Sequence, residues 1–226
     1  MIIMPDKNLQ SVIRKRMEKT MASLKKNNME CFIADSSEKA VSMIRDMLEP
    51  GSTVAAGGSQ TLAEAGIIDL LRSGDYQFLD RSGLAGDAIK KCYRDSLSAD
   101  TYICSSNAIT ENGELYNVDG NGNRAAAICY GPDTVIIVAG YNKIVRDLDE
   151  AVRRVKTVSA PANTARLCCD TYCSEKGECM TYVSADEGMT SGCRAAGRIC
   201  CNYVITGFQR VQGRIKVILV CEELGY

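Results

Sequence analysis

The sequence predicts an α/β fold with a doubly wound, mostly parallel sheet. Short apolar runs alternate with amphipathic segments, as in βαβ units. The run at 133–140 is apolar almost throughout, which is typical of a strand covered on both faces. The 226 residues suffice for one such domain with a small appendage. We therefore expect a single domain over 1–226, with a Cys-rich lobe at about 164–201 inserted before the last strands.

The first element expected is an amphipathic helix over about 6–28, because six apolar side chains recur at helical spacing among charged ones. They are Leu9, Val12, Ile13, Met17, Met21 and Leu24. A strand at 30–35 follows. The next helix is expected to begin at a capping box formed by Asp35 and Glu38, and to stop at Pro50-Gly51.

The remaining elements follow from the same two periodicities. Further helices are expected at 60–74, 83–97 and 145–158. Further strands are expected at the start of 52–59, at 76–80, 100–110, within 112–124, and at 133–140, 202–208 and 214–221. The helical pattern is expected to break at "SAPAN" (159–163), where the Cys-rich lobe begins.

The composition restricts the classes of function. The formal net charge of −1 gives no general attraction to nucleic acid or anionic membranes. No apolar run approaches the roughly 20 residues of a membrane-spanning helix, and no targeting segment is recognisable, so a cytoplasmic location is expected. The chain contains no histidine, which excludes Cys/His zinc fingers and Ser-His-Asp triads built from this chain alone.

A glycine-rich turn at 55–66 is the first candidate site. Glycines allow close approach of a ligand to the backbone, and N–H groups exposed at a helix start can bind an anion. The candidate binding residues are Gly57, Gly58, Ser59, Gln60 and Thr61, with Ser59 also a helix cap. A plain turn between strand and helix is the alternative, because the pattern is neither a dinucleotide fingerprint nor a P-loop.

A second candidate site lies at 105–126. Glu111 precedes Asn112-Gly113 and is a candidate nucleophile or base, although Asn-Gly is also a common hairpin turn. Asp119, Asn121 and Asn123 form a polar loop, with a cap of the following helix as the alternative role of Asn123. Arg124 is a candidate bidentate ligand for carboxylate or phosphate, with an ordinary surface arginine as the alternative.

The cysteines form the third candidate site. Seven of the 12 cysteines lie between Arg166 and Val204, including the close pairs Cys173/Cys179 and Cys193/Cys200. Cytosolic thiols stay reduced, so such clusters more often bind metal or perform redox chemistry than form disulfides. Cysteine-only ligation favours an iron–sulfur cluster over zinc, although the spacing matches neither the usual ferredoxin nor the usual zinc pattern. Free, partly buried thiols are the alternative. We expect the five other cysteines to be small core residues: Cys31, Cys92, Cys104, Cys129 and Cys221.

Four stretches resemble the LUD-domain family, the lactate-utilisation proteins of the LutC/YkgG type. They are "GGSQTLAEAGI", "AITENGELYNVDGNGNRAAAICYGPDTVIIVAGYNKIVRDLDEA", "PANTARL" and "RIKVILVCEELGY". The resemblance implies the NagB/RpiA/CoA-transferase-like fold, shared with ribose-5-phosphate isomerases, glucosamine-6-phosphate deaminases and CoA-transferases. It also implies a role in oxidising L-lactate to pyruvate, with partner subunits that carry iron–sulfur clusters.

A short subgroup of this family, from anaerobic bacteria, carries a cysteine tail to which this chain is similar. Cys173, Cys179, Cys193 and Cys200 fall where that tail has its four cysteines, which implies a [4Fe–4S] cluster. Here 13 residues separate Cys179 from Cys193, more than in the subgroup. Cys168, Cys169 and Cys201 are therefore candidate substitute ligands, Cys169 foremost in the predicted ligand set.

Two functions from different classes follow. The first is a cluster-binding redox or substrate-binding component of 2-hydroxy-acid metabolism. It would bind a small anionic metabolite and associate with other iron–sulfur subunits or with a second copy of itself. The alternative is a CoA-transferase- or isomerase-like enzyme using Glu111, because "TENG" is similar to the S-E-N-G stretch of CoA-transferases. In that case the Cys-rich lobe would be a structural zinc site. A third function is that of a binding or regulatory module, in which the Cys-rich lobe holds structural zinc and the cleft senses a metabolite.

Overall fold

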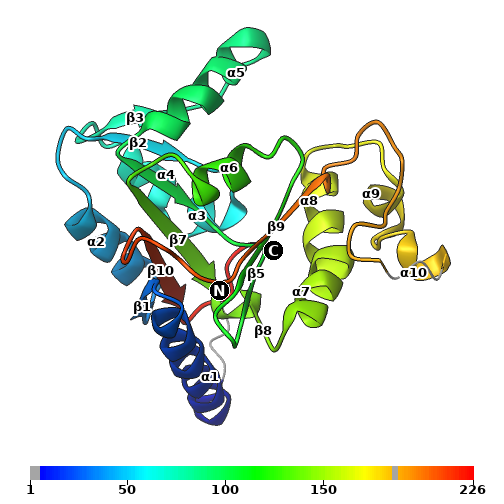
Figure 1. Cartoon of the computed structure of the whole chain (residues 1–226), viewed down its shortest axis with the longest axis horizontal. Coiled ribbons are helices and arrows are strands. Elements are labelled where there is room, and N and C mark those ends of the chain that lie inside the picture. Colours follow the sequence, from blue (N-terminus) through cyan, green and yellow to red (C-terminus); the bar gives the residue numbers. More distant parts are fainter. Residues whose placement is uncertain (1–5, 185–187) are drawn as a thin grey trace.

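A computed structural model describes residues 6–184 and 188–226 of the chain. Its centre is a six-stranded sheet in which every neighbouring pair is parallel (Figure 1). The strand order is β1 (Glu30–Ala34), β10 (Ile215–Val220), β7 (Thr134–Gly140), β4 (Thr101–Cys104), β2 (Thr53–Ala56) and β3 (Gln77–Leu79). The predicted α/β class with a mostly parallel sheet is confirmed.

Strand β7 is the centre of the fold because it is buried on both faces. Val135, Ile137 and Ala139 enter one apolar cluster, and Ile136 and Val138 enter another on the opposite face. The sequence predicted this from the uninterrupted apolar run. Helices on both faces make the sheet doubly wound.

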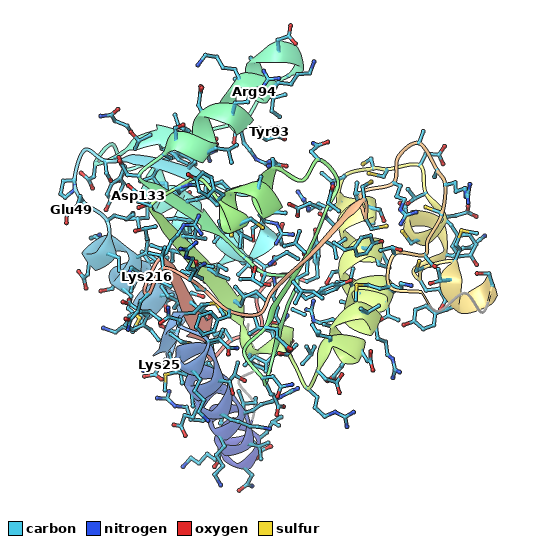
Figure 2. All side chains as sticks on the ribbon, viewed as in Figure 1. Lys25, Glu49, Tyr93, Arg94, Asp133 and Lys216 are labelled. Carbon is cyan, nitrogen blue, oxygen red and sulfur yellow. The ribbon has the colours of Figure 1, made fainter. Side chains whose placement is uncertain are left out.

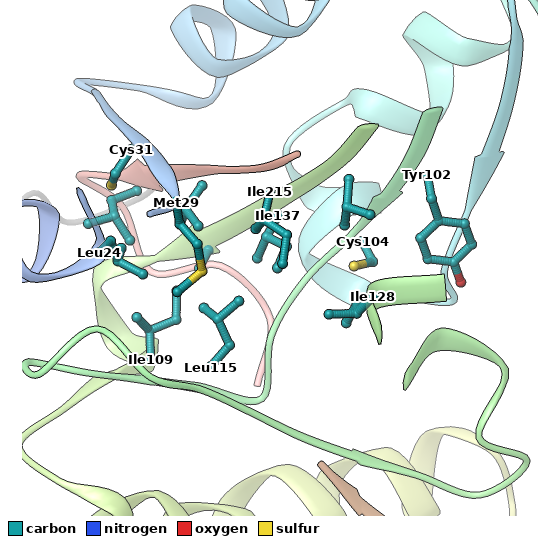
Figure 3. Packing of buried hydrophobic residues seen from close by; sticks show 14 of the residues in the cluster. Leu24, Met29, Cys31, Tyr102, Cys104, Ile109, Leu115, Ile128, Ile137 and Ile215 are labelled. Carbon is teal, nitrogen blue, oxygen red and sulfur yellow. The ribbon is translucent and has the colours of Figure 1, made fainter. Parts of the chain in front are cut away.

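On one face the sheet packs against α1 (Lys7–Lys26), α6 (Asn123–Cys129) and a second, smaller sheet. In Figure 3, Ile109 and Leu115 of the second sheet lie across from Ile137 and Ile215 of the first. The opposite face is covered by α2 (Ser37–Met47), α3 (Gln60–Glu64) and α4 (Ile67–Leu71).

The second sheet has the order β8 (Ile144–Val145), β5 (Ala108–Thr110), β6 (Leu115–Asp119) and β9 (Asn202–Thr206). Its β5–β6 and β6–β9 pairs are antiparallel. The strand predicted at 100–110 is therefore two strands, β4 and β5, in different sheets. Ser106 lies between them, and its hydroxyl donates to Ala108 O and Tyr116 O, so the polar side chain stabilises the change of direction.

Three predicted helices differ in their bounds. The helix expected at 60–74 is broken at Gly66, whose φ of 72° is left-handed and ends α3 before α4 begins. The cap of α2 is Ser36, which accepts from Lys39 N, and not Asp35. The third helix expected, at 83–97, is the shorter α5 (Gly86–Asp95), which extends away from the sheet (Figure 1).

The expected break at 159–163 is wrong. After α7 (Leu148–Arg154) the helical path continues through a π-helical turn (Val155–Ser159) into α8 (Ala160–Arg166). Pro161 is tolerated because it lies at the start of α8, just after a turn that already departs from the α-helical hydrogen-bonding pattern.

The Cys-rich segment then folds against α8 through α9 (Tyr172–Lys176) and α10 (Thr181–Ser184), on the right of Figure 1. Part of the predicted lobe, 185–187, lies outside the described residues. No helix in the described part of the chain is long and apolar enough to cross a membrane.

Candidate functional site

A polar pocket of about 340 Å³ lies where the strands of the central sheet end. Its walls come from the turns that follow β2, β4, β6 and β7, together with α8 and residues Ile199, Cys200 and Tyr226. Parallel sheets commonly bind ligands at the carboxyl ends of their strands, because loops converge there. We call this the polar pocket.

Most of the predicted glycine-turn residues reach the polar pocket. Gly58, Ser59 and Gln60 line it, and Ser59 caps α3 by accepting from Leu62 N at 3.4 Å, as predicted. Gly57 and Thr61 are not among the lining residues. Because α3 has only five residues, its dipole is small, and anion binding at this turn stays a prediction.

Arg81 is a pocket residue that the sequence did not reveal. Its guanidinium lies directly over Gly58, where a Cβ atom would overlap it, so the glycine creates the space for the arginine. It donates to the hydroxyl of Tyr93 at 3.3 Å and lies 5.8 Å from the centre of that ring, which belongs to α5 (Figure 2). Arg81 forms no ion pair within residues 6–184 and 188–226, so its charge remains available to a bound anion. The one sequence feature that could have indicated Arg81 is its position shortly after the end of β3.

Arg124 lines the polar pocket, but its hydrogen bonds go to the protein. It forms an ion pair with Asp119 at 2.6 Å and donates to Asn107 Oδ1 at 2.6 Å and Asn117 Oδ1 at 2.7 Å. Two backbone carbonyls accept its remaining hydrogens. Arg124 is thus neither a surface arginine nor a free anion ligand, and its charge is balanced within the wall by Asp119.

Asp119 also determines how the following helix begins. Its second carboxylate oxygen accepts from Ala125 N at 2.7 Å, which is the role expected of Asn123. Asn123 is instead the first residue of α6 and lines the polar pocket. The expectation that Asn123 caps the helix is therefore wrong, whereas its predicted role in binding a ligand stays a prediction.

Lys143 is a second pocket residue that sequence analysis missed. Its side chain is only 3% exposed, and its Nζ lies 2.7 Å from Thr61 Oγ1 and 2.9 Å from Ser105 Oγ. Burial, together with the nearby charges of Arg154 and Arg124, lowers the pKa of Lys143 to about 7. A lone lysine after a strand carries no sequence signal, because its partners come from distant segments.

Glu111 lies at the β5–β6 turn and does not line the polar pocket. Its carboxylate contacts Lys19 Nζ at 2.6 Å and Arg16 Nε at 2.7 Å, both on α1. The hydrogen bond from Lys19, reinforced by Arg16, holds the pKa of Glu111 below its usual range. Asn112 is likewise outside the pocket, and its carbonyl accepts from Asn27 Nδ2 at 3.0 Å. The structure thus does not bring these two residues together with the glycine turn, and the hairpin-turn alternative describes their geometry.

A second, apolar pocket is lined by all four cysteines predicted to bind metal. They are Cys173, Cys179, Cys193 and Cys200. We call it the cysteine pocket; its volume is about 20 Å³, roughly the space of one water molecule. Cys168, Cys169 and Cys201, the candidate substitutes, are not among its lining residues. Cys200, Val155 and Ala160 line both pockets, so the two are separated by a shared wall.

The thiols of the cysteine pocket are not drawn together around one point. Within the described ranges, no three Cys, Asp or Glu side chains are close enough to hold a metal ion as they stand. The Cys173 sulfur instead lies 3.4 Å from Thr164 Oγ1. Burial raises the pKa of the Cys200 thiol, and the charge of Arg198 opposes that rise. Arg198 also donates to the carbonyls of Cys193 and Cys200, each at 2.8 Å, and so connects the two segments.

The five dispersed cysteines follow the core prediction only in part. Cys31, Cys92 and Cys104 are buried, and burial raises the pKa of both Cys31 and Cys104 to about 12. Cys221 is half-buried. Cys129 is exposed near the end of α6, so the expectation of a core position is wrong for it.

Comparisons with known proteins complete the description of the site. No curated protein matches the chain. A solved DUF162 family protein from Deinococcus radiodurans is similar over 93% of this chain and 98% of its own, at 15% identity and a TM-score of 0.48. The eIF2B delta structure from Chaetomium thermophilum is similar over 61% of this chain and 54% of its own, at 16% identity and a TM-score of 0.32. With TM-scores below 0.5, neither similarity bears on the function of this chain.

The family model of the LUD domain matches residues 17–220, a span that includes the central sheet, every lining residue of the polar pocket except Tyr226, and the four cysteines of the cysteine pocket. The resemblance noted in the sequence is thereby confirmed, and the chain belongs to the LUD domain family.

Proposed function

We propose that the chain binds an iron–sulfur cluster, with [4Fe–4S] favoured, through Cys173, Cys179, Cys193 and Cys200. It acts in 2-hydroxy-acid, lactate-type metabolism as a redox or substrate-binding component. The observation that carries the proposal is that these four cysteines, from the stretch 173–200, line one pocket next to a polar one.

The donor set of the cysteine pocket fits a cluster. Four thiolates supply cysteine-only ligation, and the chain has no histidine to form a mixed site. The positively charged Lys156 lines the pocket and Arg198 lies beside Cys200, so two cations are placed to balance the negative charge of bound thiolates. The chemistry that a cluster supplies is one-electron transfer or, at an iron with an open position, Lewis-acid binding.

The polar pocket suits a small carboxylate. Arg81 and Arg166 contribute positive charge that no carboxylate neutralises in the described structure, and the volume of about 340 Å³ is at the small end for ligand sites. Arg124, whose charge Asp119 balances, orients the neighbouring loops through its hydrogen bonds. These residues would bind and orient an anionic metabolite against the wall that contains Cys200.

The test is metal analysis of the full chain purified without oxygen. We expect visible absorbance with iron and sulfide in matching amounts in the wild type, and loss of both in single Cys→Ser variants of the four pocket cysteines. Cys129→Ser is the matched control, because Cys129 is exposed and outside the cysteine pocket. Stoichiometric zinc without sulfide, or equal loss in Cys129→Ser, would contradict the proposal.

The alternative acyl-transfer function through Glu111 gains no support from the site. The carboxylate of Glu111 pairs with Lys19 and Arg16, and Glu111 lines neither pocket. A nucleophilic carboxylate requires a pocket with oxyanion donors around it.

A further inference from the structure

Lys143 is buried in a way that lysine rarely is. Buried ammonium groups usually pair with carboxylates, because an unpaired charge in the interior is costly. Lys143 is 3% exposed, lines the polar pocket and forms no ion pair in the described part of the chain. Its only hydrogen-bond partners there are the hydroxyls of Thr61 and Ser105.

Both hydroxyls can accept from Lys143, because each has an acceptor of its own: Leu224 O lies 3.1 Å from Thr61 Oγ1, and Ser106 O lies 3.4 Å from Ser105 Oγ. A neutral amine has two hydrogens for these two acceptors and keeps a lone pair, so the nucleophilic form satisfies both hydrogen bonds described for Lys143.

The charges around Lys143 favour the same form. Arg154 and Arg124 face it, and both are fixed: Arg154 donates to Asn107 O at 2.8 Å and Ser159 Oγ at 2.7 Å. Glu64 and Cys104 act in the opposite direction but do not outweigh burial and the two arginines. With a pKa of about 7, roughly half of the Lys143 side chains are neutral at neutral pH. Lysines desolvated beside another cation are the ones that enzymes use to attack carbonyl carbons.

We propose that the Lys143 amine forms an imine with the carbonyl carbon of a 2-oxo carboxylate bound in the polar pocket. The Nζ lone pair attacks C2, and the carbonyl oxygen takes up a proton. The resulting carbinolamine loses water to give the C=N bond, with no change in oxidation state. The carboxylate pairs with Arg81, which lines the same pocket. The substrate class rests on the proposed function, because a 2-oxo acid is the oxidised partner of a 2-hydroxy acid.

The experiment traps the imine. The full chain is incubated with pyruvate and cyanoborohydride, digested, and mapped by mass spectrometry. We expect Lys143 to gain the mass of pyruvate less water plus the added hydrogens. L-Lactate, which lacks the carbonyl, should give no adduct, and acetone, which keeps the methyl ketone but lacks the carboxylate, should react about tenfold more slowly at this lysine.

The matched control is Lys216, a partly buried lysine whose Nζ pairs with Glu30 at 2.9 Å and which lines neither pocket. Lys216→Arg should keep the adduct at Lys143, and Lys143→Arg should abolish it. In the wild type the rate of adduct formation at Lys143 should reach half of its maximum near pH 7. Ordinary lysines should reach half of theirs at a pH of about 10.4. The peptide map of the wild-type adduct still tests the proposal if Lys143→Arg folds poorly.

An adduct spread over surface lysines without Lys143, or no adduct at Lys143 at any pyruvate concentration, would overturn this inference. Neither result bears on the cluster, which is measured separately as iron and sulfide. An adduct at Lys143 in protein that never binds iron would support this inference while contradicting the proposed cluster.

Discussion

At the residue scale, Gly58 determines whether Arg81 can lie over the polar pocket. We predict that Gly58→Ala displaces the Arg81 guanidinium, because the new methyl group occupies its place. The affinity for pyruvate should fall about fivefold or more, a loss of about 1 kcal/mol, measured by calorimetry. Stability should change little, because the displaced group is the end of a flexible side chain.

Gly207→Ala is the control for that prediction, since a Cβ there has no atom within 4 Å and φ is not left-handed. Arg81→Met should weaken binding to a similar degree. Combining it with Gly58→Ala should add nothing, because both changes remove the same contact. Additive losses would show that the glycine acts on the ligand directly.

Glu111 is predicted to serve stability and not chemistry. Glu111→Gln should leave iron content and the Lys143 adduct unchanged and should lower the free energy of unfolding at pH 7 by no more than about 1 kcal/mol, since Arg16 and Lys19 are solvent-exposed. The native pKa of Glu111 is depressed, so its stabilisation is complete above the unfolded value of about 4.3 and disappears as pH falls through the native pKa.

Urea unfolding of wild type and Glu111→Gln at pH 7 and at acid pH tests this pH dependence, measured as the difference in their free energies of unfolding. The difference should be present at pH 7 and vanish in acid. Glu18→Gln, which removes an exposed pair within α1, is the control and should show a smaller difference. A loss of catalytic activity in Glu111→Gln with unchanged stability would return the acyl-transfer function to consideration.

At the scale of elements, the sequence predicted what local periodicity controls. The apolar run of β7 and the helical spacing of α1 identified both elements, because each buries its face along its whole length. The break at Gly66 was missed although the glycine, which adopts a left-handed φ without strain, was a local signal for it. The uninterrupted path through Pro161 was missed because the π-helical turn before it has no recognisable sequence pattern. Lys143 and Arg81 were missed because each is defined by partners from distant turns.

The segments that carry Cys193 and Cys200 give a prediction at this scale. Arg198 connects them by donating to the carbonyls of both cysteines and of Thr190, each at 2.8 Å. Arg198→Met should leave the central sheet intact but lower iron and sulfide content, because the two thiols are no longer held toward one pocket. Arg194→Met, at an exposed position in the same segment, should retain the metal. If both variants contain equal amounts of iron and sulfide, cluster binding does not depend on the hydrogen bonds of Arg198.

At the scale of the whole molecule, the two pockets form one unit because they share a wall. The glycine turn and the cysteines lie more than a hundred residues apart in the sequence, yet Cys200, Val155 and Ala160 line both pockets. The glycine turn and the cysteines carried a recognisable sequence signal, whereas Arg81 and Lys143 did not. The adjacency of the two pockets had no sequence signal. It results from the continuous helical path from α7 to α8, where the sequence predicted a break.

The shared wall predicts that a ligand in the polar pocket changes the electronic environment of a cluster in the cysteine pocket. Pyruvate or L-lactate should alter the electron paramagnetic resonance spectrum of the reduced protein. Arg81→Met should require about tenfold more ligand for the same change, because it weakens binding without touching a cysteine. Propanediol, which has no carboxylate, is the control and should leave the spectrum unchanged. If pyruvate binds by calorimetry and the spectrum stays constant at saturation, the cluster is electronically separate from the pocket, and its role is structural or that of a distant electron relay.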